Sequence, residues 1–444
     1  MNNITIILAT IFQNGGDATR AIEIAKIIRK FKPDNYNLRI VFISHGSKFE
    51  QNVIDSGFEL YHAEPHLEGI RYQDDFQTRF GELVGNEKLS YELLQGEIKA
   101  YHDINPDMVI YGFWPIGSIA KRIAIPDVKG IAFLPLPLTH AFLDEPLTFP
   151  DELFLSRLPL NFQRKLIKIL PKQIKENNPA LRHSLIRSAA EKIGWEHGTL
   201  TNIFEMLKSD IYLVNDLPVY YQTNNYEKNV VFTGPIYAME KSEQIEDEGI
   251  LHILDKSNKR KKLFCTLGSS GSKKELLEVI KMLNTSVGLK YSGIVLSPAS
   301  VCPIEEASTQ LKNPNIYITD KFVPAKQINK QVDAVICHGG QGTLQTAITS
   351  ATPIIGVATQ PEQKVNLEHI EQFGSAIRIP SRAWNHKIIG RELERMFSNY
   401  KTFKMKAELL KAEYEAMNPE KIIGECVWKQ LAVKKPNNTL IVMG

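Results

Sequence analysis

The stretch from Val335 to Asn366, VICHGGQGTLQTAITSATPIIGVATQPEQKVN, decides the fold of this 444-residue chain. It predicts a buried strand, a glycine-rich turn, a helix that begins at Thr343, a second strand after Pro353 and then a polar loop. A glycine-rich turn that leads into a helix presents unpaired backbone N–H groups and the positive end of the helix dipole. This arrangement is typical of an anion site, most often one for phosphate.

Individual residues of this stretch can be assigned to the anion site. Gly340 and Gly342 allow the backbone to approach a ligand closely. His338 lies at the end of the first strand and can add an imidazole donor, and Thr343 can add a hydroxyl donor. The polar cluster Gln360-Pro361-Glu362-Gln363 follows the second strand, and we expect it at the same edge of the sheet.

Strand and helix signals alternate along the rest of the chain, which predicts parallel sheets with right-handed crossovers. The series begins with a strand at Ile4–Ala9 and begins again, after the polar stretch Lys241–Gly249, with a strand at Leu263–Leu267. A chain of this length exceeds what one core normally supports. The predicted fold class is therefore α/β, with two doubly wound, Rossmann-like parallel-sheet domains that face a central cleft.

The predicted domains are residues 1–233, residues 234–420 and a C-terminal tail at 421–444 that could pack back on the N-terminal domain. A long helical segment at about 149–208 interrupts the N-terminal domain. Its part Arg157–Arg187 is heavily basic, with apolar residues between the charges. Two interpretations stay open: a solvated helical excursion, or a surface for acidic lipid or a large amphiphilic acceptor.

Composition and charge narrow the class of protein. The 43% hydrophobic and 23% charged content is ordinary for a globular protein, and the net charge of +3 is too small to indicate a nucleic-acid partner. The four cysteines are scattered without metal-ligand spacing, which predicts reduced thiols in a cytoplasmic protein. The N-terminus MNNITIILATIF lacks the flanks of a signal peptide, and no run is long enough to span a membrane.

Several motifs occur together in a fixed order. They are Phe232-Thr233-Gly234-Pro235, the loop Gly268–Ser272, Asp320-Lys321-Phe322-Val323-Pro324, the HGGQGT turn and Pro361-Glu362-Gln363. This ordered set resembles the signature of the UDP-glycosyltransferase superfamily, whose members are two-domain GT-B enzymes that glycosylate small molecules. The resemblance covers nearly the whole chain and is most specific in the region 234–374.

The resemblance implies a site for a UDP- or dTDP-sugar. His338 would donate to the diphosphate, and Ser269 and Ser270 would lie near it. Phe322 would stack on the base and the backbone of Val323 would bind the edge of the base, although Phe322 alone could equally be a core aromatic. Further N–H and hydroxyl donors, and the groups that hold the transferred sugar, would come from Gly340, Gln341, Gly342, Thr343, Glu362 and Gln363.

The turn after the first strand contains Gly16-Asp17, which resembles the turn of the glycopeptide and sterol glycosyltransferase branch. That resemblance implies that Asp17 is the general base for the acceptor hydroxyl. The alternative is that Asp17 only caps the following helix. His45 and His140 are back-up bases. The acceptor pocket is expected from apolar N-terminal loops, with candidate lining residues Phe113, Trp114, His140 and Phe142.

Together these expectations describe an inverting, metal-independent hexosyltransferase that moves a sugar from a nucleotide donor to a hydroxyl of a hydrophobic small-molecule or lipid acceptor. Neither a resident cofactor nor a nucleic-acid partner is expected, and peripheral membrane contact stays open. The alternatives are a nucleotide-sugar epimerase of the same fold and a catalytically silent partner subunit. The helix after HGGQGT carries Gln345-Thr346-Ala347 instead of an acid for the ribose, so uridine and deoxythymidine donors are not distinguished.

Overall fold

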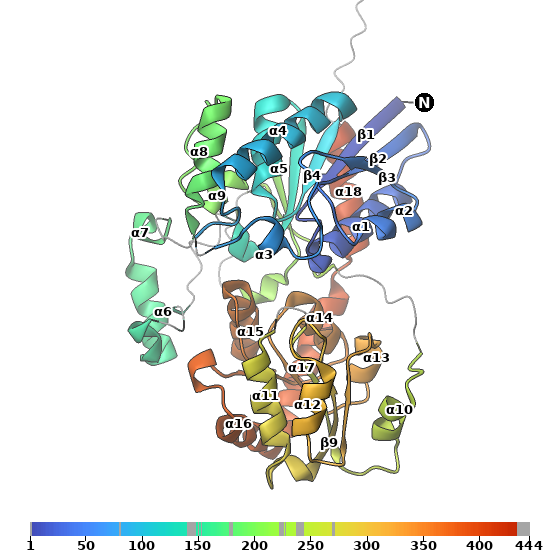
Figure 1. The fold of residues 1–444 in the computed structure, drawn as a ribbon, viewed down its shortest axis with the longest axis vertical. Coiled ribbons are helices and arrows are strands. Elements are labelled where there is room, and N and C mark those ends of the chain that lie inside the picture. The colour runs from blue at the N-terminus through green and yellow to red at the C-terminus, as the bar shows by residue number, and fades with distance from the viewer. Residues whose placement is uncertain are drawn as a thin grey trace, which may run out of the picture. The chain divides into compact units, whose positions relative to one another are not determined.

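The computed structural model describes residues 2–79, 81–139, 148–149, 151, 153–176, 181–221, 226, 228–236, 244–268 and 271–432. The chain forms two compact units (Figure 1). Unit 1 consists of Met1–Glu145, Lys168–Ala238 and Asn418–Gly444, and unit 2 consists of Pro146–Ile167 and Met239–Met417. Each unit is built around one parallel sheet, which confirms the predicted α/β class with two Rossmann-like domains.

The sheet of unit 1 has the strand order β3-β2-β1-β4-β5-β6-β7, and every neighbouring pair is parallel. The order changes direction between β1 and β4, and such a switch point is where open α/β sheets bind ligands. The strands are β1 (Asn2–Ala9), β2 (Tyr36–Ser44), β3 (Glu59–His62), β4 (Met108–Tyr111), β5 (Lys129–Leu134), β6 (Ile211–Val214) and β7 (Val230–Phe232).

Hydrophobic clusters cover both faces of this sheet. On one face, side chains of β1 and β4 pack with α4, α5 and α8, and on the other they pack with α1 and α18. Short 3-10 turns lie at Leu136–Leu138 and Pro218–Tyr220. The helices of unit 1 are α1 (Gly15–Lys30), α2 (Glu50–Asp55), α3 (Tyr72–Asp75), α4 (Glu87–Ile104), α5 (Pro115–Ala124), α7 (Lys172–Glu176), α8 (Ser184–Ile193), α9 (Ile203–Met206) and α18 (Pro419–Ala432).

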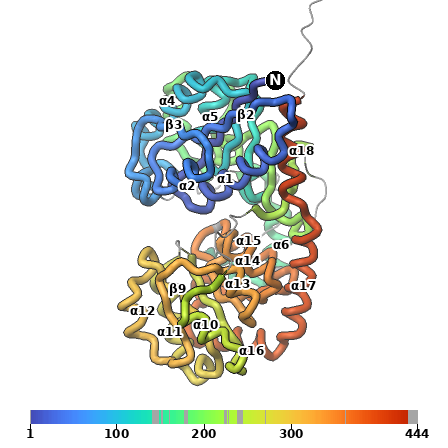
Figure 2. Tube along the Cα trace, turned by 90° about the vertical axis from the view of Figure 1, so that its right-hand side faces the viewer, coloured from blue at the N-terminus to red at the C-terminus, as the bar shows by residue number. Residues whose placement is uncertain are grey.

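The last helix among the described residues, α18, completes unit 1 by packing on its first helix, α1 (Figure 2). The indole Nε1 of Trp428 donates to the backbone oxygen of Ile28 at 3.1 Å, and its ring lies 5.3 Å from that of Tyr36. A Cβ atom at Gly424 would lie 2.4 Å from Cγ of Phe31, so only glycine lets the two helices approach this closely. Helices α1 and α18, which are far apart in the sequence, therefore share one hydrophobic core.

The sheet of unit 2 has the order β10-β9-β8-β11-β12-β13 and is also parallel throughout. Its strands are β8 (Lys261–Thr266), β9 (Tyr291–Leu296), β10 (Ile316–Thr319), β11 (Ala334–Cys337), β12 (Ile354–Gly356) and β13 (Ala376–Arg378). Its helices are α10 (Glu248–Leu254), α11 (Lys273–Leu283), α12 (Ile304–Gln310), α13 (Ala325–Asn329), α14 (Gln341–Thr349), α15 (Pro361–Phe373), α16 (His386–Ser398) and α17 (Tyr400–Ala416), with 3-10 turns at Gly288–Lys290 and Ser381–Ala383. Across the described residues, no helix combines the length and the apolar character that crossing a bilayer requires.

The helical segment predicted at 149–208 does not stay in one unit. The 3-10 turn η3 (Phe154–Arg157) and most of α6 (Leu160–Ile169) belong to unit 2, and the chain returns to unit 1 at Lys168. Sequence patterns placed all of this segment in the N-terminal domain because it lies between strands of that sheet. The structure divides this segment between the two units.

A buried ionic network holds the start of this segment on unit 2. Arg378 at the end of β13 contacts Asp151 at 3.0 Å and Glu368 at 3.3 Å, and Lys364 contacts Glu368 at 2.8 Å. Lys364 Nζ also donates to Thr148 Oγ1 at 2.5 Å. The charged side chains are at most 11% exposed. Because an unpaired buried charge is costly, Asp151 and its neighbours stay with the arginine and lysine of unit 2.

Candidate functional site

The switch point of the unit 2 sheet lies between β8 and β11. From β8 the chain crosses to β9 on one side, and from β11 it crosses to β12 on the other. β8 leads into Gly268 and β11 leads into His338, so both residues lie at the carboxyl edge of the sheet. This edge is where ligands bind in open α/β sheets.

The imidazole of His338 is held between two glycines. A Cβ atom at Gly268 would lie 2.6 Å from Cε1 of the ring, and a Cβ atom at Gly340 would lie 2.5 Å from Nε2. Gly268 also has a φ of +60°, a conformation that favours glycine. Both glycines are therefore required by the position of the ring, and we name this arrangement the histidine cradle (Gly268, His338, Gly340).

The His338 side chain is 5% exposed, and this burial lowers the pKa of its imidazole to about 4. The ring is therefore neutral at physiological pH. Its Nδ1 atom is buried and has no hydrogen-bond partner among the described residues. Buried polar atoms are nearly always satisfied, so an exception at a switch point is typical of a ligand site.

Helix α14 begins directly beside the cradle. Its N-cap is Gly340, and no side chain caps its first turn. The sequence predicted a start at Thr343, but the helix begins two residues earlier, so the N–H of Gly342 belongs to the first turn. A Cβ atom at Gly342 would meet no atom within 4 Å, so this first turn faces open space. The uncapped N–H groups and the helix dipole together favour an anion at this position.

The polar cluster at 360–363 is not the loop that the sequence predicted, because Pro361 is the first residue of α15. A proline at this position suits a helix start, and Gln360 and Gln363 form a capping box. The Oε1 atom of Gln363 accepts hydrogen bonds from Thr359 N at 2.9 Å, Thr359 Oγ1 at 2.8 Å and Gln360 N at 3.2 Å. This oxygen is thus engaged in holding the helix start.

Glu362 is half-buried in the first turn of α15. Its Oε1 atom accepts from Asn366 Nδ2 at 3.4 Å, and the same amide donates to the backbone oxygen of Gly339 at 3.2 Å. Gly339, with a φ of +85°, packs against Leu367 of α15. Asn366 therefore ties the predicted sugar-binding helix to the glycine turn that leads into α14.

Phe322, in the loop after β10, is 93% exposed, while its neighbour Val323 is 6% exposed. The alternative that Phe322 is a core aromatic is therefore wrong. An exposed aromatic ring at the carboxyl edge of the sheet, held beside a buried valine, offers a flat surface for a planar ligand group.

In unit 1, Asp17 lies in the first turn of α1 and is 8% exposed. The N-cap is Asn14, whose side chain accepts from Gly16 N at 3.2 Å, so the alternative that Asp17 is the N-cap is wrong. Asn14 Nδ2 donates to one carboxylate oxygen of Asp17 at 2.9 Å, and Arg20 donates to the other at 3.4 Å. Asn14 and Arg20 therefore help to fix the orientation of this carboxylate.

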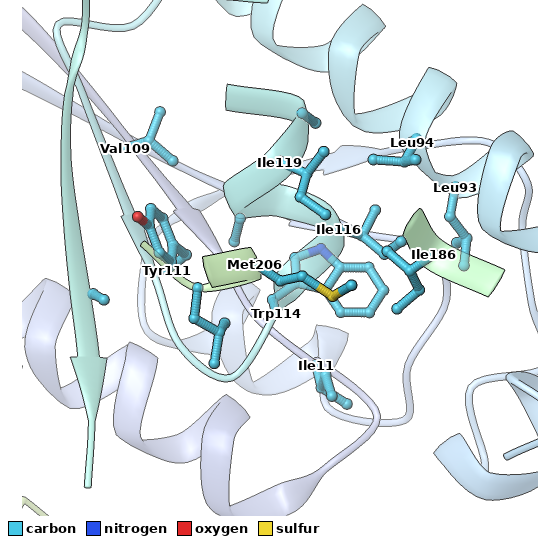
Figure 3. Close-up of a cluster of buried hydrophobic side chains, with 14 of the residues drawn as sticks. Ile11, Leu93, Leu94, Val109, Tyr111, Trp114, Ile116, Ile119, Ile186 and Met206 are labelled. Atoms are coloured by element: carbon cyan, nitrogen blue, oxygen red, sulfur yellow. The ribbon is translucent and has the colours of Figure 1, made fainter. Parts of the chain in front are cut away.

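Trp114 does not line an acceptor pocket, which corrects its predicted place. Its side chain is 2% exposed and lies in a cluster of buried hydrophobic side chains (Figure 3). Its ring stacks on that of Phe76 at 5.4 Å, and its Nε1 donates to Glu97 at 2.6 Å. An aromatic ring after a buried strand packs into the core as readily as it lines a pocket. Phe113 is half-buried beside the same core, and the back-up base His45 is buried, with Nε2 3.7 Å from Glu97.

Four predicted site residues lie outside the described residues, namely Ser269, Ser270, His140 and Phe142. Among the residues that the structure does describe, no group of three or more His, Cys, Asp or Glu side chains is arranged to hold a metal ion.

Comparisons with known proteins agree with this geometry. The family described as "Erythromycin biosynthesis protein CIII-like, C-terminal domain" matches residues 304–428. A PGL/p-HBAD biosynthesis glycosyltransferase of Mycobacterium tuberculosis is 26% identical over 283 residues, or 63% of this chain and 55% of the relative. A PGL/p-HBAD biosynthesis rhamnosyltransferase of Mycobacterium bovis is 24% identical over 64% of this chain and 58% of its own length. The chain thus spans little more than half of these relatives.

The fold is shared with solved glycosyltransferases. The calicheamicin glycosyltransferase CalG4 matches with a TM-score of 0.63 and 15% identity, covering 98% of this chain and all of the other. The spinosyn rhamnosyltransferase SpnG, solved with thymidine diphosphate, matches with a TM-score of 0.58 and 12% identity over 96% of this chain and all of the other.

The chain therefore resembles glycosyltransferases in sequence over 63% of its length and shares the fold of solved glycosyltransferases over nearly all of it. The predicted GT-B fold is thereby confirmed. Among the motifs of this chain, the structure brings Gly340 and His338 together with Gly268, which the sequence placed only in the loop Gly268–Ser272. The partnership of His338 with Gly268 spans 70 positions, and no local pattern signals it.

The neutral state of His338 has a consequence for stability. Because its pKa in the folded protein lies below the ordinary 6.5, the unfolded chain binds the proton more readily, and stability should fall as the pH drops from about 6.5 to 4. The shift corresponds to about 3 kcal/mol. Urea unfolding at pH 7 and pH 4.5 should show that His338→Gln loses less stability on acidification than the wild type. An equal loss in both proteins would contradict a buried neutral His338.

Proposed function

We propose that this chain is a glycosyltransferase that moves a sugar from a nucleoside-diphosphate donor, bound by unit 2, to a hydroxyl group of an acceptor. The observation that carries the proposal is the histidine cradle at the switch point. It combines a buried imidazole that lacks a partner for Nδ1 with the uncapped start of α14. A diphosphate would satisfy both, because it offers several strong acceptor oxygens and negative charge.

Phe322 and Glu362 extend this proposal to the two ends of the donor. The exposed ring of Phe322 supports stacking on the nucleobase. Glu362, in the first turn of α15, is proposed to bind hydroxyls of the transferred sugar, while Gln363 positions that turn through its capping oxygen. The donor is proposed to be a UDP- or dTDP-sugar, and the thymidine diphosphate bound to SpnG favours including the latter.

The proposed reaction is a single inverting displacement. The acceptor oxygen forms a bond to the anomeric carbon, the bond from that carbon to the diphosphate oxygen breaks, and Asp17 takes the acceptor proton. Negative charge grows on the leaving diphosphate, where the imidazole N–H of His338 and the N–H groups of α14 stabilise it without reorganisation. These donors supply the stabilisation that a metal ion would otherwise give, so we propose that the transfer is metal-independent.

The acceptor is proposed to be a hydrophobic, hydroxylated molecule of natural-product or lipid origin. The names of the relatives support this class, since they refer to PGL/p-HBAD biosynthesis and to calicheamicin and spinosyn glycosylation. Transfer distinguishes this proposal from the epimerase alternative: free nucleoside diphosphate should form only when an acceptor is present, whereas conversion of donor alone would indicate epimerisation.

A panel of nucleoside diphosphates tests the donor site directly. We expect UDP or dTDP to raise the melting temperature more than ADP or GDP. A ligand that binds only the folded state adds about 2.7 kcal/mol to the free energy of unfolding at a hundredfold excess over its Kd, so the preferred nucleotide should give a clear shift. The shift should persist in EDTA and should shrink in His338→Gln. If no diphosphate stabilises the wild type, unit 2 does not hold the donor.

A further inference from the structure

Exposed apolar side chains gather in one short part of the chain. Among the described residues, fourteen large hydrophobic side chains are exposed, and six of them lie within positions 153–174. They lie in η3 and the residue before it, in α6 and in α7, and Figure 1 labels the two helices. The six are Leu153, Phe154, Leu155, Phe162, Ile169 and Ile174.

The same stretch carries a strong positive charge. Positions 153–175 contain six lysines and arginines and no aspartate or glutamate. The rest of the chain has 47 basic and 50 acidic residues, since the totals are 53 and 50. The overall net charge of +3 is therefore the sum of a charge of +6 on this stretch and a charge of −3 on the rest of the chain.

Helical spacing places apolar and basic side chains on one face of α6. Phe162, Lys165 and Ile169 are separated by three and four positions, so they lie above one another, and all three are exposed. Phe162 is 50% exposed and Ile169 is 76% exposed. Lys165 and the neighbouring Lys168 form no ion pair with any described residue, so their charges are available to a partner.

The preceding turn, η3, has the same character. Phe154 is 73% exposed, and the guanidinium of Arg157 lies 5.5 Å from its ring centroid. Leu153 and Leu155 flank Phe154 in the sequence and are also exposed. We name these residues together with the exposed face of α6 the η3–α6 surface (Leu153, Phe154, Leu155, Arg157, Phe162, Lys165, Lys168, Ile169).

Buried polar contacts hold this surface in place. The Nε2 atom of Gln163, which is 2% exposed, donates to the backbone oxygens of Ser156 at 2.9 Å and Leu158 at 2.6 Å, and its Oε1 accepts from Phe149 N at 3.1 Å. Arg382 donates to Ser156 Oγ at 2.7 Å. The apolar side chains are thus presented by an ordered scaffold, and ordering them costs little when a partner arrives.

We propose that the η3–α6 surface docks this protein on an anionic lipid bilayer. A bilayer interface receives aromatic and aliphatic side chains at the boundary of its acyl chains and attracts lysine and arginine through its phosphate groups. An acidic protein would match the charges but not the exposed phenylalanines. A second copy of this chain would bring like charges together, which disfavours self-association through this surface.

Co-sedimentation with vesicles tests the proposal on the full-length protein. We expect binding to vesicles of phosphatidylcholine mixed with phosphatidylglycerol, weaker binding to phosphatidylcholine alone, and a decrease at high salt. Phe154→Ser and Phe162→Ser should each weaken binding to the anionic vesicles by about tenfold. Lys165→Glu combined with Lys168→Glu should weaken it at low salt and remove most of its salt dependence.

Matched substitutions on α17 serve as controls. Leu409→Ser removes a side chain that is 49% exposed, and Lys401→Glu reverses an exposed charge, and neither residue belongs to the η3–α6 surface. These variants should bind anionic vesicles as the wild type does. All variants should keep the nucleotide-induced melting shift of the wild type, so a failure of the membrane proposal is distinguishable from a failure of the donor site.

Three results would overturn the proposal. One is an absence of binding to anionic vesicles, and another is binding that the surface variants and the α17 variants weaken equally. The third is a concentration-dependent dimer, seen by sedimentation without vesicles, that Phe154→Ser dissociates, because a second copy would then cover the surface.

Discussion

Replacing Asp17 with asparagine is expected to lower kcat by about 10²–10⁴, the range that general-base assistance usually contributes. Asparagine has nearly the same shape and can still contact Asn14, but it cannot take the proton of the acceptor hydroxyl. Because we propose that unit 2 binds the donor, the affinity for the donor should not change. Steady-state kinetics with a saturating donor, together with calorimetry for the nucleoside diphosphate, would measure both quantities.

Asn14, which lies in the same turn as Asp17, provides a control for the Asp17 variant. Asn14→Ser keeps an N-cap oxygen for Gly16 N but removes the amide that donates to Asp17. We expect this variant to keep its stability and to lose much less activity than Asp17→Asn. If Asp17→Asn left kcat unchanged, the base would have to be another group, and if both variants lost activity equally, Asp17 would serve only to shape the turn.

Adding one methyl group at Gly268 is expected to lower the transfer rate by about 10²–10³, the usual effect of losing one hydrogen-bond donor to a developing negative charge. The new Cβ atom would lie 2.6 Å from Cε1 of His338, so the imidazole has to leave the cradle. Binding of the nucleoside diphosphate should weaken in parallel. Single-turnover kinetics and calorimetry on Gly268→Ala would show both losses.

A double-mutant cycle separates this clash from a general loss of stability. In a His338→Ala background the ring is absent, so adding Gly268→Ala should reduce activity much less than it does in the wild type. Gly342→Ala is the matched control for folding, because its Cβ meets open space and should keep or raise the stability of the ligand-free protein. Fully additive effects in the cycle would show that Gly268 does not act through His338.

Local signals predicted the part of the site that is continuous in the sequence. The glycine turn after β11 could be interpreted because glycine, histidine and the following helix act within a few residues of one another. The helix starts were less well predicted: α14 begins before Thr343, and Pro361 begins α15 instead of belonging to a loop. At such ends, capping geometry decides the boundary, and Gln363, which the sequence predicted to bind the sugar, forms the capping box that starts α15.

Contacts between distant positions could not be predicted. The pairing of Asp151 with Arg378 spans 227 positions and moves a whole segment from one unit to the other. The burial of Trp114 could not be predicted either, since an aromatic residue after a strand is compatible with a pocket or a core. Both depend on which elements pack together, and this information is absent from any short stretch of sequence.

The packing of α18 on α1 bears on how this protein is made. All of unit 2 is synthesised before α18, the last described helix, although unit 1 contains the first residues of the sequence. We therefore expect the second unit to finish folding first. Until α18 arrives, the apolar face of α1 around Ile28 and Phe31 stays uncovered. A nascent or C-terminally shortened chain would then expose a surface that chaperones bind and that promotes aggregation.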